Sequence, residues 1–178
     1  MTQLTGAEAR FRDAIREKDR NLRAFLNVNG LSEPLDPMRW LTFLNGIKNT
    51  LGNINNDLGF IATLLVKDYL ERRFQIVDFD AAAKAQGASG IDIDAKSLDG
   101  KRIVGELKTT KPYQPGFGAN QRVSILKDLT RLATTEAEHR FLFVIDPDAF
   151  IALQAKSFAS KAPGVEVVDL VSGQSFIC

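Results

Sequence analysis

The spacing of apolar positions changes once along the chain, near residue 75, and divides the predicted elements into two kinds. Before that point apolar residues recur every three or four positions, as in helices with one buried face. We expect helices at 7–28, from Pro37 with Asp36 as its cap, and at 56–74. After it, alternate positions are apolar, which is typical of half-buried strands.

The second part of the chain predicts a sheet with helices between some of its strands. Strands are expected at 75–79, 90–97, 102–110, 140–145, 164–170 and 175–178, and helices at 120–136, capped by Asn120, and from Asp146 to about 158. This order is typical of an α/β or α+β fold with a mixed β-sheet flanked by helices. Residues 1–55 are expected to form an N-terminal helical extension packed on a core of residues 56–178, as one compact domain overall.

Composition narrows the class of protein. The chain has 178 residues, 44% of them hydrophobic, and a net charge of +1, so no strong overall field marks a nucleic-acid or membrane partner. The single cysteine, Cys178, allows no internal disulfide. One cysteine and one histidine in the whole sequence are too few ligands for a zinc site. Apolar runs are too short to cross a bilayer. We therefore expect a cytoplasmic protein that binds no membrane.

The candidate chemistry lies on the strands 90–97 and 102–110, which Asp99-Gly100 joins by a tight turn. Acids stand at Asp92 and Asp94 of the first strand, while Glu106 and Lys108 of the second lie two apart and share a face. The register of the two strands decides whether these groups meet.

Three registers are possible. A two-residue turn sets Asp92 opposite Leu107 and separates the acids onto opposite faces. The other two align the apolar positions of both strands, and the apolar pattern favours them. One of these sets Asp92 opposite Glu106. The other sets Asp94 opposite Glu106 and Asp92 opposite Lys108.

Facing carboxylates on neighbouring strands repel one another unless a cation lies between them. Carboxylate oxygens suit Mg²⁺, for which Mn²⁺ can substitute, and the Leu107 carbonyl could complete the coordination. Lys108 beside them can orient or deprotonate a water and offset charge on a phosphate. The sequence thus predicts a metal-dependent phosphodiester hydrolysis site; the alternative is a solvated strand face with a weak ion pair.

An acid-x-Lys pattern is weak by itself, because the chain contains it three times, at Asp94-Ala-Lys96, Asp99-Gly-Lys101 and Glu106-Leu-Lys108. The Asp99 copy is a turn, and the Asp94 copy is followed by a strand. Only the Glu106 copy has an acid-bearing strand before it and a predicted helix after it, so we assign the site there.

Gly90-Ile-Asp92-Ile-Asp94 followed by Val104-Gly-Glu106-Leu-Lys108 resembles the signature of the PD-(D/E)XK nuclease superfamily. The resemblance covers residues 56–147 and implies a restriction-endonuclease-like core of helix, three strands, helix and strand. It implies Asp92 and Glu106 as metal ligands and Lys108 as the residue that serves the attacking water. No proline precedes Asp92, so Asp94 stays an alternate first ligand.

Within this superfamily the chain most resembles type II restriction endonucleases, through GELKTT at 105–110, Gly118–Gln121 and the strand FVID; the Gly-Ile-Asp form of the first acid also resembles Mrr-like nucleases. The resemblance implies double-stranded DNA as substrate. We expect a homodimer formed through the N-terminal helices, so that both strands are cut. The alternatives are a repair or junction-resolving nuclease, and a non-catalytic DNA-binding or assembly module on the same fold.

Charge supports a DNA-binding surface near the predicted site. From Lys96 to Arg131 the chain has eight basic and three acidic residues, a local excess suited to tracking phosphates. The loop 111–119, rich in Pro and Gly, follows the Glu-x-Lys strand. The residues expected to contact DNA are Lys111, Tyr113, Gln114, Gln121 and Arg122.

Overall fold

The computed structural model describes residues 3–31, 36–84, 88–112, 114 and 117–178. Contacts divide the chain into two compact units, Leu4–Leu58 and a second that holds Gly59–Cys178. No helix within the described ranges is both long and apolar enough to cross a membrane.

The first unit holds helices α1 (Gly6–Val28), α2 (Pro37–Leu51) and the first turn of α3 (Ile54–Phe74). A capping box between Thr5 and Glu8 begins α1. As predicted, α2 begins at Pro37, and the carboxylate of Asp36 accepts hydrogen bonds from the Met38 and Arg39 N–H groups. The helix starts therefore follow from local capping chemistry.

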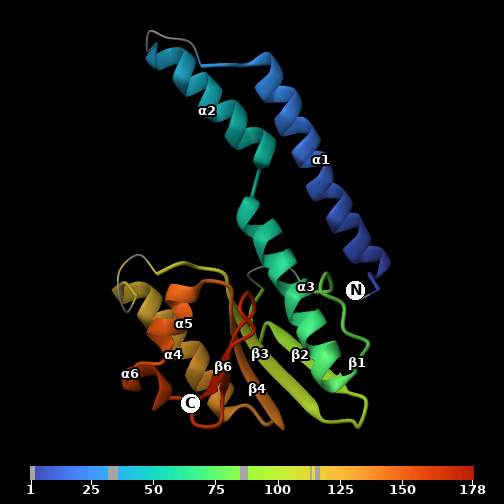
Figure 1. Cartoon of the computed structure of the whole chain (residues 1–178), viewed down its shortest axis with the longest axis vertical. Coiled ribbons are helices and arrows are strands. Elements are labelled where there is room, and N and C mark those ends of the chain that lie inside the picture. The colour runs from blue at the N-terminus through green and yellow to red at the C-terminus, as the bar shows by residue number, and fades with distance from the viewer. Residues whose placement is uncertain (1–2, 32–35, 85–87, 113, 115–116) are drawn as a thin grey trace. The chain divides into compact units, whose positions relative to one another are not determined.

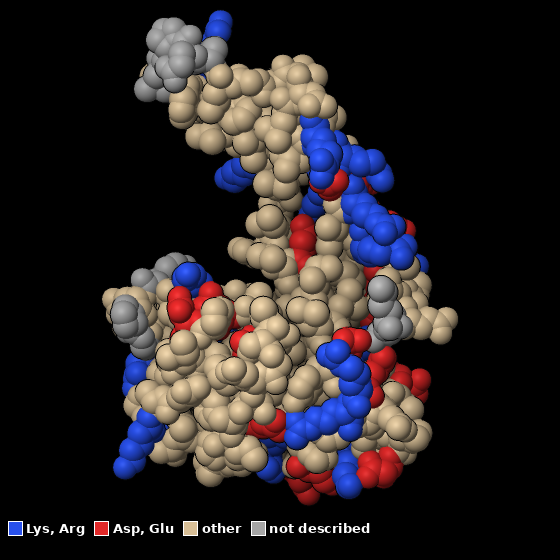
Figure 2. Space-filling model, in the orientation of Figure 1, with Lys and Arg blue, Asp and Glu red and all other residues tan. Residues whose placement is uncertain are grey.

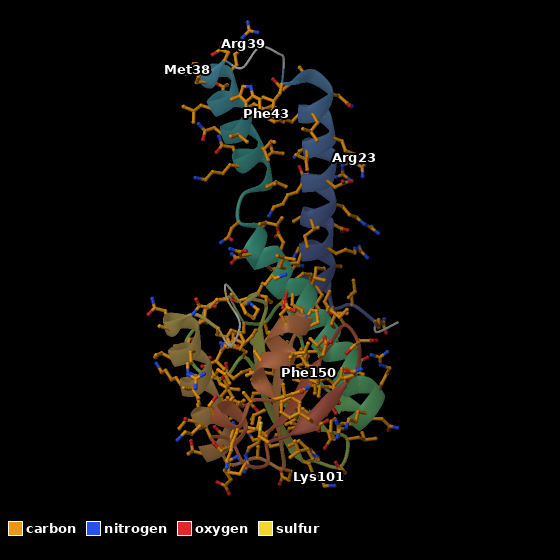
Figure 3. All side chains as sticks on the ribbon, turned by 60° about the vertical axis from the view of Figure 1, so that its left-hand side comes forward. Arg23, Met38, Arg39, Phe43, Lys101 and Phe150 are labelled. Carbon is orange, nitrogen blue, oxygen red and sulfur yellow. The ribbon has the colours of Figure 1, made fainter. Side chains whose placement is uncertain are left out.

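Aromatic packing joins α1 to α2. The rings of Phe25 and Phe43 lie 5.7 Å apart, and Figure 3 shows Phe43 on the side of α2 that faces α1, whereas Arg23 points away. Gly46 makes room for this contact, because a Cβ there would lie 2.4 Å from the Phe25 ring. The two helices thus form a hairpin whose close approach depends on a small residue.

The two helices of this hairpin expose different kinds of side chains. Figure 2 shows charged side chains gathered along α1, while the visible part of α2 is mostly uncharged. None of the residues of α2, all of which the structure describes, is buried. Met38, Leu41 and Leu44 remain 69%, 54% and 55% exposed. The hairpin therefore leaves large apolar side chains of α2 in solvent.

The second unit contains one six-stranded sheet in which spatial order follows chain order (Figure 1). Its strands are β1 (Ile76–Val77), β2 (Ile93–Ser97), β3 (Arg102–Lys108), β4 (His139–Val144), β5 (Glu166–Asp169) and β6 (Ser175–Ile177). The first three are antiparallel, β3, β4 and β5 are parallel, and β6 is antiparallel to β5. The helices between parallel strands are α4 (Ala119–Thr134), α5 (Pro147–Leu153) and α6 (Lys156–Ala159).

Helices cover both faces of this sheet (Figure 1). On one face, α3 contributes Val66 and Leu70 to a core with Ile103. On the other, α4, α5 and α6 pack against strand residues that include Val104. The predicted mixed sheet flanked by helices is confirmed, and β3 is buried on both of its faces.

Several predicted boundaries were wrong in detail, and the strand expected at 90–97 begins only at Ile93, so Asp92 directly precedes it. The strand expected at 75–79 is the two-residue β1, because Asp78 takes a left-handed φ of 55° that ends it. Helix α4 has Gly118, not Asn120, as its N-cap. The helix expected from Asp146 to about 158 stops at Leu153 and restarts at Lys156, because Ala155 is extended, and Leu153 and Phe158 are both buried as a result.

Candidate active site

The register of β2 and β3 is one of the two that the apolar pattern favoured. Ile93 lies opposite Gly105, and Asp94 opposite Val104. Carried one residue further, the same register sets Asp92 opposite Glu106. The Leu107 N–H also donates a 3.1 Å hydrogen bond to Asp92 Oδ2, which ties this carboxylate to β3 at the position of the Glu-x-Lys motif.

The alternate ligand, Asp94, has a different partner. Its two carboxylate oxygens accept hydrogen bonds of 3.1 and 2.7 Å from the Arg102 guanidinium, and its side chain is 55% exposed. Paired in this way across β2 and β3, it stands opposite Val104. The geometry therefore brings Asp92, rather than Asp94, to Glu106.

Glu106 is the buried acid of the site, with 1% of its surface exposed. Burial above all, together with the nearby Asp92 carboxylate, raises the pKa of Glu106 to about 8, while Arg131 acts in the opposite direction. The alternative of a solvated strand face is wrong for this residue. Burial and the Asp92 charge both disfavour the ionised form of Glu106, so a cation between the two carboxylates would stabilise that form.

Helix α4 supplies two groups that sequence analysis did not assign to the site. Arg131 donates from Nε and Nη2 to Glu106 Oε1, at 3.0 and 2.7 Å. The same Nη2 lies 2.6 Å from Asp128 Oδ1, and Asp128 Oδ2 lies 2.5 Å from Lys108 Nζ. The site is therefore a network of acids and bases across β2, β3 and α4.

A signal for Asp128 was present in the sequence. Buried residues of α4 stand at Ile125, Asp128, Leu129 and Leu132, the spacing of one helix face. An acid on an otherwise apolar face must be paired when it is buried. Arg131 was harder to find, because it is only partly buried and reaches Glu106 by its long side chain.

A cavity of 440 Å³ opens beside the site, and its lining includes Asp92, Leu107 and Lys108. Lys84 also lines it: its Nζ donates a 2.5 Å hydrogen bond to the Ile91 carbonyl and lies 4.0 Å from Asp92 Oδ1. Lys84 was not among the predicted site residues, and no pattern in the sequence around it distinguishes it. The cavity gives a water or a phosphate access to Asp92 and to both lysines.

The carboxylate pair fits a hydrated divalent cation. In the described part of the chain, no three Asp, Glu, His or Cys side chains form a group that could hold a metal ion. Mg²⁺ commonly binds through one or two carboxylates and keeps several waters, so two acids meet its needs. The donors that fit are the carboxylate oxygens of Asp92 and Glu106. A cation there would offset the repulsion between the two carboxylates.

The residues expected to contact DNA lie on the loop before α4 and in its first turn. Lys111 is 71% exposed and 3.5 Å from Asp148, and Gln114 is exposed. Gln121 is engaged in the fold, because its Nε2 donates to the Lys111 carbonyl at 3.0 Å. Arg122 stacks on the Phe158 ring at 4.5 Å. Tyr113 lies outside the described residues.

This arrangement has the parts that phosphodiester hydrolysis needs: oxygen ligands for a divalent cation, an ammonium beside them and an open cavity. Comparisons of this chain with protein-family models, with curated proteins and with solved structures found no match.

Proposed function

We propose that this protein is a Mg²⁺-dependent DNA endonuclease that hydrolyses phosphodiester bonds, and that it acts as a type II restriction endonuclease. The observation that carries the proposal is the meeting of Asp92, directly before β2, with Glu106 on β3, where Lys108 stands two residues further along. An acid pair of this kind is unfavourable unless a cation accompanies it.

Each residue has a distinct part in the proposed reaction. Asp92 and Glu106 hold the divalent cation together with the Leu107 carbonyl. When bound, the cation lowers the pKa of a water and draws negative charge from the phosphate. Lys108, whose ammonium contacts Asp128, orients the water and offsets charge that builds on the phosphoryl oxygens.

The order of elements also supports the proposal. Helix α3, strands β1, β2 and β3, helix α4 and strand β4 follow one another as the resemblance to PD-(D/E)XK nucleases implies. Asp92 directly precedes the second strand and Glu106 lies on the third. A register with these acids on opposite faces would favour a non-catalytic module, and the observed register does not have that property.

DNA contact is assigned to the loop that leaves β3. Lys111 and Gln114 are exposed on it, three and six residues beyond Lys108, so a duplex held there has a phosphate close to the site. Tyr113, which lies between them in the sequence, stays a prediction. Arg122 and Gln121 stand at the start of α4, where they support the loop as well as the proposed DNA surface.

The test is plasmid cleavage in Mg²⁺, Mn²⁺ or EDTA by the wild type and by Asp92→Asn, Lys108→Ala and Asp94→Asn. We expect metal-dependent cutting that falls by about 100-fold or more in the Asp92 and Lys108 variants. Asp94→Asn is the matched control, because Asp94 lies on the same strand but pairs with Arg102. Its rate should stay within about threefold of wild type.

The products decide between the alternatives. Discrete fragments indicate sequence-specific restriction, whereas selective cutting of branched DNA indicates a repair or junction-resolving nuclease. Retention of DNA without any cutting, in every metal tried, would overturn the proposal in favour of a binding module. An equal loss in Asp94→Asn would show that the assignment of Asp92 is wrong.

A further inference from the structure

Asp128 is a buried acid that lies next to the proposed catalytic groups but faces them from α4. It is 6% exposed and stands on the apolar face of the helix, beside Leu129. Buried carboxylates are costly unless they are paired, and Asp128 is paired twice. Its position and its charge therefore need an explanation beyond packing.

The two oxygens of Asp128 contact two different cations. Oδ1 lies 2.6 Å from Arg131 Nη2, and Oδ2 lies 2.5 Å from Lys108 Nζ. Arg131 in turn holds Oε1 of Glu106 with two hydrogen bonds. Asp128 thus contacts Lys108 directly and Glu106 through one intermediate, which makes it the link between the ammonium and the metal-binding acid.

Electrostatics gives this link a consequence for metal binding. A guanidinium against Glu106 opposes a divalent cation at the same carboxylate, because like charges repel strongly in a partly buried site. The negative charge of Asp128 lies against that guanidinium and offsets it. Without this negative charge, the positive charges of Arg131 and Lys108 would both repel the cation, and Asp128 would no longer offset them.

We propose that Asp128 is a positioning residue for the hydrolysis, which holds Lys108 in place and offsets Arg131 so that Asp92 and Glu106 can accept a divalent cation. This inference rests on the proposed function. The contrasting explanation is a buried ion network that stabilises the fold and has no effect on metal binding beyond that.

The test uses binding instead of cleavage. The melting temperature of the whole protein is measured across a titration with Mn²⁺, and again with Ca²⁺, for wild type, Asp128→Asn and Asp169→Asn. Asp169 is the matched control, a buried acid that accepts hydrogen bonds from Val171 N–H and Ser172 Oγ–H away from the site. We expect the metal midpoint to rise about tenfold in Asp128→Asn. In Asp169→Asn only the metal-free melting temperature should fall.

A double variant separates the two explanations. In Asp128→Asn with Arg131→Gln the uncompensated guanidinium is gone, while the glutamine amide can still donate to Glu106. We expect the metal midpoint to return to within about threefold of wild type, because the loss of the guanidinium charge offsets the loss of the carboxylate charge. If the network is purely structural, the second substitution should raise the metal midpoint further.

Contrary results are distinguishable. A metal midpoint in Asp128→Asn equal to that of Asp169→Asn, with a clear response in the wild type, overturns the role of Asp128 and leaves the proposed nuclease standing. A double variant with a higher metal midpoint than Asp128→Asn overturns it in the same way. No response to either metal in the wild type overturns both the metal site and this inference.

Discussion

At the residue scale, Gly105 shows why the Glu-x-Lys strand contains a glycine. A Cβ at this position would lie 3.0 Å from the Phe143 ring and 3.3 Å from the Phe141 carbonyl oxygen. Both neighbours belong to β4, which pairs with β3 in parallel. The absent side chain therefore leaves room for the Phe143 ring against β3.

Glu106 gives the protein a specific pH dependence. Its folded pKa of about 8 is raised above the ordinary value of 4.5, so the folded state keeps a proton that the unfolded state loses. The resulting stability is present in full below about pH 4.5 and is lost as pH rises to about 8. In EDTA, the free energy of unfolding should fall by about 1 kcal/mol per pH unit across this window.

Urea unfolding of wild type and Glu106→Gln at several pH values checks this prediction. The glutamine cannot ionise, so its free energy of unfolding should show no such slope between pH 5 and 8, a window of about three units. The lowered pKa values of Asp99, Glu138 and Glu166 have their effects at lower pH and do not interfere. Equal slopes in both proteins would contradict the burial of an ionisable Glu106.

At the element scale, α4 links the core to the site. Its apolar residues hold it on the sheet, and Asp128 and Arg131 project from the same part of the helix. The position of the network therefore depends on how α4 packs. A shift of this helix changes the distance from Arg131 to Glu106 and from Asp128 to Lys108 together.

Two matched core truncations test this dependence. Leu129→Ala in α4 and Leu153→Ala in α5 each empty a position that is at most 1% exposed, so each should cost about 2–5 kcal/mol of unfolding free energy. Only Leu129→Ala should also raise the midpoint of the Mn²⁺ titration, because α5 supplies no group to the network. The titration is done at a temperature well below the melting transitions of both variants. Equal Mn²⁺ midpoints in the two variants would show that metal binding does not depend on the packing of α4.

At the scale of the whole molecule, the basic excess of residues 96–131 is partly offset by acids from other segments. Arg102 pairs with Asp94, and Lys111 with Asp148, acids that lie outside that segment. Within the segment, Lys108 and Arg131 face buried acids in the site. A count along the sequence therefore overstates the positive charge that is free to meet phosphates.

The expected homodimer has a candidate surface on α2. Leu41 and Leu44 are more than half exposed, and a two-fold axis would set this face against its copy. We predict that Leu41→Asp with Leu44→Asp makes the protein monomeric by light scattering and converts double-strand cutting into nicking. Arg23→Ala, on the side of α1 that points away from α2, is the control. A monomeric wild type would contradict the prediction.

The sequence by itself determined the elements, two possible registers and the chemistry of the Glu-x-Lys strand. Helix and strand periods, the Asp36-Pro37 start and the Asp99-Gly100 turn act over a few residues, so they can be read without a structure. The alternation of apolar residues excluded the register that would have separated Asp92 from Glu106. The exact ends of α4, α5 and β1 were not predictable, because backbone geometry decided them.

Only the tertiary structure brought Asp92, rather than Asp94, to Glu106, and only the tertiary structure buried Glu106 and set α4 against it. The packing of β3 between two layers of helices buried the central residues of a strand that was predicted to be half-exposed. Arg131 contacts Glu106 although the two residues are 25 positions apart in the sequence, because α4, which connects β3 to β4, packs against the sheet. Such contacts depend on how elements pack together, and local spacing carries no information about the partner that a long side chain reaches.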